Sequence, residues 1–229
     1  MKTIWAVVGD CYHEAEPAKK SLEQVLEPFL ANGQTGLLYK EVSDLAAGQL
    51  GQKPDLVILF AENRLEPQSD PEAAWMTEDI GRQIEAYVSD GGAWLAWHSG
   101  LASYPEHGAY VNMLRGYFLS HPKEHSDVTY TPVGGSALGE LDGTFRFKDE
   151  HYFVACSEPE TEVFLRSSSR DGESIAGWLH PYGEGRVACV TPAHLPEGLL
   201  DEGFIRLMQR VIAWSLELEP VMRREGKWS

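Results

Sequence analysis

Cysteine is scarce in this chain. The 229 residues include three cysteines, Cys11, Cys156 and Cys189, and no pair of them has Cys-x-x-Cys spacing. An odd number of cysteines without such spacing argues against a disulfide framework. A reducing cytoplasm is therefore the location that we expect.

Positive charge is also scarce. The chain has 19 Lys and Arg residues and 35 Asp and Glu residues, which gives a net charge of −16 and a pI of about 4.8. Such a chain repels the phosphates of nucleic acids and of anionic lipids. We therefore expect no nucleic-acid partner and no membrane partner.

Long apolar runs are missing as well. The first run, Ile4–Val8, is too short for a secretory signal or a membrane span. The apolar fraction of 43% is nevertheless sufficient for a full core. The length allows one domain or two small ones, and we expect a single domain over residues 1–218, followed by a charged tail over 219–229.

Short apolar runs alternate with helical patterns in the first half. Ile4–Val8, Asp55–Phe60 and Ala93–Trp97 are typical of buried strands, while Pro17–Leu30 and Met76–Val88 repeat apolar residues at helical spacing. The alternation predicts an α/β fold with a mostly parallel sheet and helices on both faces. In the second half, glycine-rich turns separate short runs that predict appended antiparallel strands at 128–133, 145–147, 162–166 and 175–179.

The segment 90–100 reads Asp-Gly-Gly-Ala-Trp-Leu-Ala-Trp-His-Ser-Gly. It predicts a buried strand that runs into a tight turn with His98 at the tip. In α/β hydrolases and class I glutamine amidotransferases, this place holds a nucleophile, which a strained turn keeps rigid and exposed. A histidine at this position indicates a metal ligand or a proton carrier instead.

Several further motifs follow one another along the chain. They are His13-Glu14, the segment 91–100, Leu114-Arg-Gly-Tyr-Phe with His121-Pro122, Asp149-Glu150-His-Tyr152, Gly183-Glu-Gly-Arg-Val and His194. In this order and spacing the chain resembles the ThuA-like (trehalose-utilisation) family, over about residues 3 to 216. That family lies within the class I glutamine amidotransferase-like superfamily.

The resemblance implies a flavodoxin-like sheet with extra strands and a role in carbohydrate metabolism. Family members often occur beside sugar dehydrogenases that make 3-keto glycosides, so the expected partner is a small carbohydrate. Amide hydrolysis by the amidotransferase route needs a cysteine thiolate at the turn. His98 stands there, which excludes that reaction.

Three histidines are expected at one edge of the sheet. His13, His98 and His194 each follow a strand predicted to be parallel, so their side chains can converge. Three imidazoles suit a divalent, zinc-like ion, with Glu150 or water completing its shell. The alternative is a metal-free pocket in which imidazoles bind sugar hydroxyls and shuttle protons.

The expected catalytic residues are His98, Glu150 and His194. Glu150 is preferred to Asp149 because neighbours on a strand face opposite ways. The expected substrate contacts are Glu14, His121 and Tyr152, with His121 on a loop after a helix.

Two rival sites have less support. Cys11 and His13 form a nucleophile and base only if both face one cavity. Gly183–Arg186 is typical of a hairpin turn, because no helix follows it to cradle a phosphate, and we expect no nucleotide cofactor. The remaining histidines, at positions 107, 125, 151 and 180, are expected at the surface or in loops.

Two functions follow from this reading. The first is an enzyme that acts on a sugar or 3-keto glycoside as a lyase, isomerase or hydrolase, by metal-assisted or His/Glu acid–base chemistry. The second is a non-catalytic sugar-binding or regulatory protein on an amidotransferase-like fold. The sequence leaves open whether the chain forms a homo-oligomer.

Overall fold

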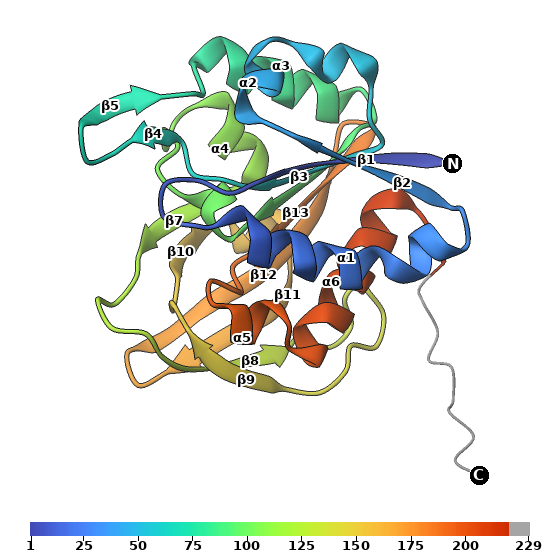
Figure 1. Ribbon diagram of the computed structural model, residues 1–229. Helices are drawn as coiled ribbons and strands as arrows, with labels where there is room; N and C mark the ends of the chain where they lie inside the picture. The colour runs from blue at the N-terminus through green and yellow to red at the C-terminus, as the bar shows by residue number, and fades with distance from the viewer. Residues whose placement is uncertain (220–229) are drawn as a thin grey trace.

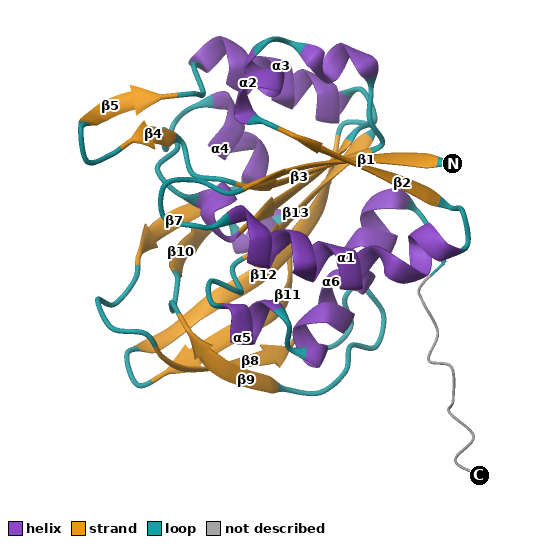
Figure 2. Ribbon diagram, in the orientation of Figure 1, coloured by secondary structure: helices purple, strands orange, loops and turns teal. Residues whose placement is uncertain are grey.

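A nine-stranded sheet forms the centre of the computed structural model, which describes residues 1–219 (Figures 1 and 2). Five neighbouring strands are parallel. In spatial order they are β2 (Thr35–Lys40), β1 (Lys2–Val8), β3 (Leu56–Phe60), β6 (Ala93–Trp97) and β13 (Gly185–Val190). This arrangement confirms the predicted α/β fold.

The same sheet continues past β13 with antiparallel strands. These are β12 (Gly172–Tyr182), β11 (Glu162–Ser169), β8 (Ser126–Pro132) and β9 (Phe145–Asp149). The turn at 183–184 joins β12 to β13 as a hairpin, as expected. The predicted antiparallel runs are all strands, and they extend the parallel sheet rather than forming a second one.

Helices cover both faces of the parallel strands (Figure 2). One face packs against α1 (Ala15–Ala31), α5 (Pro196–Leu199) and α6 (Glu202–Leu216). The other packs against α3 (Glu78–Ser89) and α4 (Ala109–Leu114), with α2 (Val42–Ala46) and the 3₁₀ turn η1 (Gln49–Gln52) nearby.

Strand residues alternate between the two faces. Ile4 and Ala6 of β1 enter one apolar cluster, while Trp5 and Val7 enter the other. Because both faces of a parallel strand are buried, its sequence is continuously apolar. The same burial explains Trp94 and Trp97, which are fully buried in the core as predicted.

Two small two-stranded sheets lie outside the main sheet. β4 (Arg64–Glu66) pairs with β5 (Asp70–Ala74), and β7 (Gly116–Ser120) pairs with β10 (Phe153–Cys156). The first pair lies between β3 and α3, in a segment that contains Pro67 and Pro71. Short 3₁₀ turns, η2 (His98–Leu101) and η3 (Glu158–Glu160), complete the secondary structure.

The expectation of a surface or loop position is wrong for His180, whereas His151 lies in the loop between β9 and β10 but is buried there. His151 is 1% exposed and its ring nitrogens contact the hydroxyls of Ser167 and Ser169. His180 lies within β12, where its Nε2–H donates to the Met113 carbonyl at 2.9 Å. Both ring nitrogens of His151 and the Nε2 of His180 therefore have partners that permit burial, whereas the buried Nδ1 of His180 has none among the described residues.

Within residues 1–219, no helix combines the length and the apolar character that crossing a membrane requires. The charged tail predicted for 219–229 lies, except for Glu219, outside the described residues. The family match reported below covers residues 4–215. The single-domain assignment over 1–218 stays a prediction.

Burial of His180 makes stability depend on pH. Its pKa falls from the usual 6.5 to about 4 because burial disfavours the charged ring. Between these values the unfolded chain binds a proton that the folded chain refuses, so stability decreases as pH falls from about 6.5 to 4. Since one pKa unit corresponds to about 1.4 kcal/mol, the loss is on the order of 3 kcal/mol.

Urea unfolding of the wild type and of His180→Gln at pH 7 and pH 4.5 measures this effect. We expect the variant to lose less stability than the wild type over that interval. The exposed His107 is the matched control, and His107→Gln should behave as the wild type. An unchanged pH dependence in His180→Gln would contradict the assignment.

Candidate functional site: a histidine and carboxylate cluster at the sheet edge

Four adjacent parallel strands end at the same edge of the sheet, and polar residues follow each of them. His13 follows β1, residues 61–64 follow β3, His98 follows β6 and His194 follows β13. The strand order reverses between β1 and β3, and in open α/β sheets ligands bind at such a switch point.

His98 begins the 3₁₀ turn directly after β6 and has a left-handed backbone, with φ of 48°. Such a conformation is uncommon for a residue other than glycine and stores strain at functional sites. Gly100 lets the turn pack on β3, because a Cβ there would lie 2.2 Å from the Leu59 carbonyl oxygen. The predicted strained turn is therefore present.

The expectation that this turn exposes His98 is wrong, because the ring is completely buried. Tyr152 stacks on it with ring centroids 4.1 Å apart, and Phe60 lies on it at 5.6 Å. The His98 Nδ1 atom is 2.7 Å from the Thr191 carbonyl oxygen. A carbonyl can only accept, so Nδ1 carries a proton, and Nε2 is the nitrogen that remains to face the cluster.

His13 is oriented in the same way by Asp10, its neighbour in the loop after β1. The His13 Nδ1–H donates to Asp10 Oδ1 at 2.7 Å. Burial opposes ionisation of Asp10, but hydrogen bonds and the charge of His13 outweigh it and lower its pKa to about 2. The His13 Nε2 atom is buried and has no hydrogen-bond partner among the described residues.

His194 is positioned through its backbone. Its N–H donates to Asp149 Oδ1 at 2.8 Å, and the Tyr130 hydroxyl donates to Asp149 Oδ2 at 2.6 Å. Burial raises the pKa of Asp149. Burial and repulsion from His98 lower the pKa of His194 to about 4, so its imidazole is neutral at pH 7.

Glu150 points into the cluster. Its neighbour Asp149 faces the other way, as the strand alternation predicted, and accepts the hydrogen bonds from His194 and Tyr130. Glu150 Oε2 is 3.5 Å from His98 Nε2 and 3.5 Å from His194 Nδ1. Glu150 Oε1 faces His121 at 3.2 Å and His125 at 4.0 Å. Burial opposes its ionisation, but the histidines, His98 above all, lower its pKa to about 2.

His125 is a residue that sequence reasoning missed. It precedes β8, and its ring lies 5.2 Å from the His194 ring. His121 follows the strand β7 and not a helix, which corrects the expected connection. Its position at the pocket agrees with the prediction.

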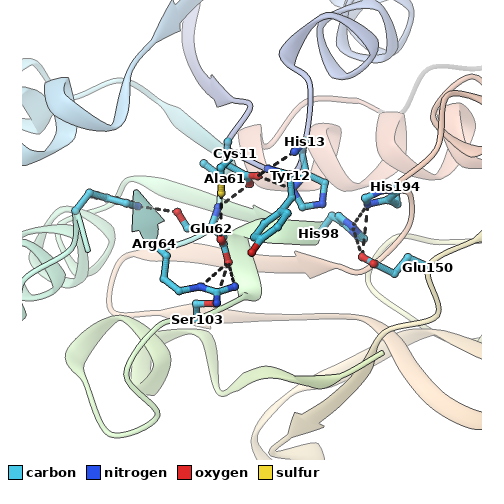
Figure 3. Close-up of polar contacts among 12 residues, drawn as sticks. Cys11, Tyr12, His13, Ala61, Glu62, Arg64, His98, Ser103, Glu150 and His194 are labelled. Atoms are coloured by element: carbon cyan, nitrogen blue, oxygen red, sulfur yellow. Dashed lines mark hydrogen bonds and ion pairs between the residues drawn. The ribbon is translucent and has the colours of Figure 1, made fainter. Parts of the chain in front are cut away.

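Four donor atoms, one from each of His13, His98, Glu150 and His194, lie within 4.8 Å of one another. Figure 3 shows these residues converging. The separation of His98 Nε2 and His194 Nδ1 is 3.3 Å. Donor atoms 2.0–2.1 Å from a tetrahedral zinc ion lie about 3.3 Å from each other, which the separations of 3.3 and 3.5 Å among His98, His194 and Glu150 match.

A cavity of about 460 Å³ opens beside this cluster, within the range of roughly 300–1,000 Å³ common for small-molecule sites. Of the expected residues, His13, His121, Glu150, Tyr152 and His194 line it. His98 lies beneath them. Glu14, an expected substrate contact, is exposed at the N-terminus of α1 and does not line the cavity.

Cys11 does not form the alternative nucleophile. Its Sγ contacts Glu62 Oε1 at 3.5 Å, and the Nδ1 of His13 is engaged by Asp10. Burial and the adjacent Glu62 carboxylate raise the pKa of the thiol to about 11. A nucleophilic cysteine needs the opposite shift.

The strand order and the strained turn after β6 are those of an α/β protein and are consistent with the class I glutamine amidotransferase-like superfamily. The sequence matches the ThuA family, described as trehalose utilisation, over residues 4–215. The chain therefore belongs to the ThuA family, as its motifs predicted.

Solved structures share the fold at low sequence identity. A ThuA-like protein from Parabacteroides merdae has a TM-score of 0.76 at 13% identity, with 98% of this chain and 93% of that chain covered. A cytoplasmic protein from Salmonella typhimurium LT2 has a TM-score of 0.62 at 13% identity, with 94% and 99% covered. A β-galactosidase from Rahnella has a TM-score of 0.60 at 16% identity, with 96% of this chain but 32% of the galactosidase covered. No curated protein matches significantly.

The environment of Cys11 predicts slow alkylation. At pH 8, a pKa of about 11 instead of 9.0 leaves about a hundredfold less thiolate, which is the reactive form. Iodoacetamide labelling followed by peptide mass spectrometry measures this residue separately. We expect Cys11 in the folded protein to react at least tenfold more slowly than in the urea-unfolded chain.

The variant Glu62→Gln removes the carboxylate that opposes thiolate formation and should accelerate Cys11 labelling several-fold. Equal rates for folded and unfolded wild-type protein would contradict the assigned environment. They would also support the alternative hypothesis that Cys11 is a nucleophile with His13 as its base.

Proposed function

We propose that this chain is an enzyme of carbohydrate metabolism that acts on a sugar or 3-keto glycoside. Its reacting centre comprises His13, His98, His194 and Glu150. The observation that carries this proposal is the convergence of their four donor atoms beside a cavity. Asp10 accepts a hydrogen bond from His13 Nδ1, and the Thr191 carbonyl accepts one from His98 Nδ1. These bonds orient the Nε2 atom of each ring toward that point.

These four residues would hold a divalent ion of the zinc class. When bound, such an ion polarises a substrate carbonyl or lowers the pKa of a water molecule. The hydrogen bonds from His13 to Asp10 and from His98 to Thr191 are the outer contacts that orient histidine ligands and raise their basicity.

The chain's own groups have separate roles in this scheme. Glu150, with a pKa of about 2, is ionised at neutral pH and supplies negative charge rather than strong basicity. His98 is buried, so it acts as a ligand and does not touch the sugar. His121 lines the cavity with its side chain 38% exposed, which suits a hydrogen bond to a substrate hydroxyl.

Without an ion, the same residues would act as acids and bases. His194 is neutral at pH 7 and lines the cavity, so it can accept the proton beside a substrate carbonyl. Elimination, isomerisation and hydrolysis of a keto-sugar share this first step. The enzyme would therefore be a lyase, isomerase or hydrolase.

The comparisons support a carbohydrate as the substrate class. The family description names trehalose utilisation, and one structural neighbour is a β-galactosidase. The Salmonella neighbour is called a cytoplasmic protein, which supports a cytoplasmic location for this chain.

Elemental analysis tests the metal proposal. Protein purified without chelators should contain close to one zinc-class ion per chain. Asp10→Asn weakens the acceptor that fixes His13, so metal affinity should fall about 10- to 100-fold. Asp127→Asn, which alters an exposed carboxylate paired with Arg146, is the matched control and should keep the wild-type metal content. Wild-type protein without an ion at the four residues would count against the proposal.

Activity tests the enzymatic proposal. His98→Ala should lower the turnover of a 3-keto disaccharide by at least about a hundredfold, the scale of a lost catalytic group. His98→Asn should do the same, and it tolerates the left-handed backbone of this position better than Ala does. His107→Ala should retain wild-type activity. If the wild type binds the sugar but consumes no keto-sugar, with or without added metals, the protein is a sugar-binding or regulatory protein instead.

A further inference from the structure

The cavity has a second polar wall on the side away from the histidines. Glu62, Arg64 and Ser103 form it, and the Tyr12 ring stands between this wall and the histidine cluster (Figure 3). Asp10 links the two sides, because its Oδ1 accepts from His13 while its Oδ2 accepts from the Glu62 backbone N–H at 2.9 Å. The scheme above uses none of the residues in this second wall.

Glu62 is a buried carboxylate, 4% exposed, with its contacts concentrated on one oxygen. Oε2 accepts from Arg64 Nη2 at 2.8 Å, from Arg64 Nε at 3.2 Å and from the Ser103 hydroxyl at 2.9 Å. Among the described residues, Oε1 has the weak Cys11 thiol as its only hydrogen-bond donor, and Arg64 Nη1 has no partner. In this wall of the cavity, Glu62 Oε1 can therefore still accept a hydrogen bond and Arg64 Nη1 can still donate one.

The backbone that carries this wall is held rigidly. The Asn63 side chain, 3% exposed, accepts from the Met76 N–H and donates to the Ser103 carbonyl. The Trp75 indole donates to the Glu62 carbonyl at 3.1 Å. Ser103 has a left-handed backbone with φ of 65°, a strained conformation of the kind that clusters at ligand sites. Such support fixes binding groups in place before a ligand arrives.

The charge of the wall indicates which ligands it suits. Glu62 neutralises the positive charge of the Arg64 guanidinium. A further carboxylate, Asp10, accepts a hydrogen bond from the Glu62 backbone N–H. A phosphate or carboxylate ligand would need cationic donors without such a partner. Paired donors and acceptors instead match hydroxyl groups, each of which both donates and accepts. Tyr12, which is 50% exposed with the Arg64 guanidinium 5.7 Å from its ring centroid, adds an aromatic surface.

We propose that Glu62, Arg64, Ser103 and Tyr12 form a second subsite that binds the non-reacting ring of a neutral, unphosphorylated glycoside. This inference rests on the proposed function, since it places the reacting ring at the histidine cluster. It specifies the substrate class as a glycoside of at least two units, rather than a free monosaccharide or a sugar phosphate.

Selectivity between one ring and two tests the subsite. The probes are the 3-keto form of a glucose disaccharide, the same compound phosphorylated at a primary hydroxyl, and 3-keto-glucose. Arg64→Gln should lower kcat/KM for the disaccharide about tenfold or more, because it removes hydrogen bonds to the distant ring. It should change kcat/KM for 3-keto-glucose less than about twofold. Wild-type protein should prefer the unphosphorylated disaccharide.

Tyr12→Ala, at an exposed position, should show the same selectivity without leaving Glu62 unpaired. Arg146→Gln breaks a comparable but exposed pair with Asp127 and should leave all three rates unchanged. Equal losses on the disaccharide and on 3-keto-glucose, no loss at all, or a preference for the phosphorylated compound would each overturn the proposal.

Binding separates failure of the subsite from failure of the proposed function. Calorimetric titration with the unoxidised disaccharide, which has no keto group to react, needs no turnover. If no keto-sugar is consumed but this disaccharide binds at least tenfold more weakly to Arg64→Gln and Tyr12→Ala than to wild type, the enzymatic function fails and the subsite stands. If the wild type does not bind the disaccharide, or binds it no better than the variants, the subsite is overturned.

Discussion

Two hydrogen bonds on the outer side of the histidine cluster determine what it can do. Asp10 holds the proton of His13 on Nδ1, and the Thr191 carbonyl holds the proton of His98 on the corresponding atom. Both rings therefore direct their Nε2 atoms toward Glu150 and His194. When these nitrogens are deprotonated, their lone pairs and the Glu150 carboxylate together suit a cation at their centre, which is the metal site that we propose.

The fold explains why these groups meet. The loops after β1, β6 and β13 lie at one edge of the parallel sheet, and the linker after β9 adds Glu150 from the antiparallel extension. The strained turn after β6 is the place where related folds expose a nucleophile. Here the turn buries His98 beneath Tyr152, so the ligand that we propose enters the site from below the cavity. The turn that holds a nucleophile in related folds holds a histidine in this chain.

Sequence patterns predicted much of this arrangement. The apolar runs identified the strands, and strand ends located His13, His98 and His194, because period and burial are local properties. Glu150 followed from strand alternation. The sequence did not predict the burial of His98, which depends on Tyr152 folding over it from a distant segment. It also missed His125, it misplaced His180, and it did not predict the burial of the loop residue His151, because the burial of both depends on partners far along the chain. Glu14 was wrongly expected in the pocket, because the chain turns into α1 at that residue.

Anomalous diffraction from crystals grown without chelators tests the central claim most directly. The account predicts one peak at a zinc-class absorption edge, bonded to His13 Nε2, His98 Nε2, His194 Nδ1 and Glu150. A structure with no peak there, in which the imidazoles hydrogen-bond to one another or to water alone, would contradict it.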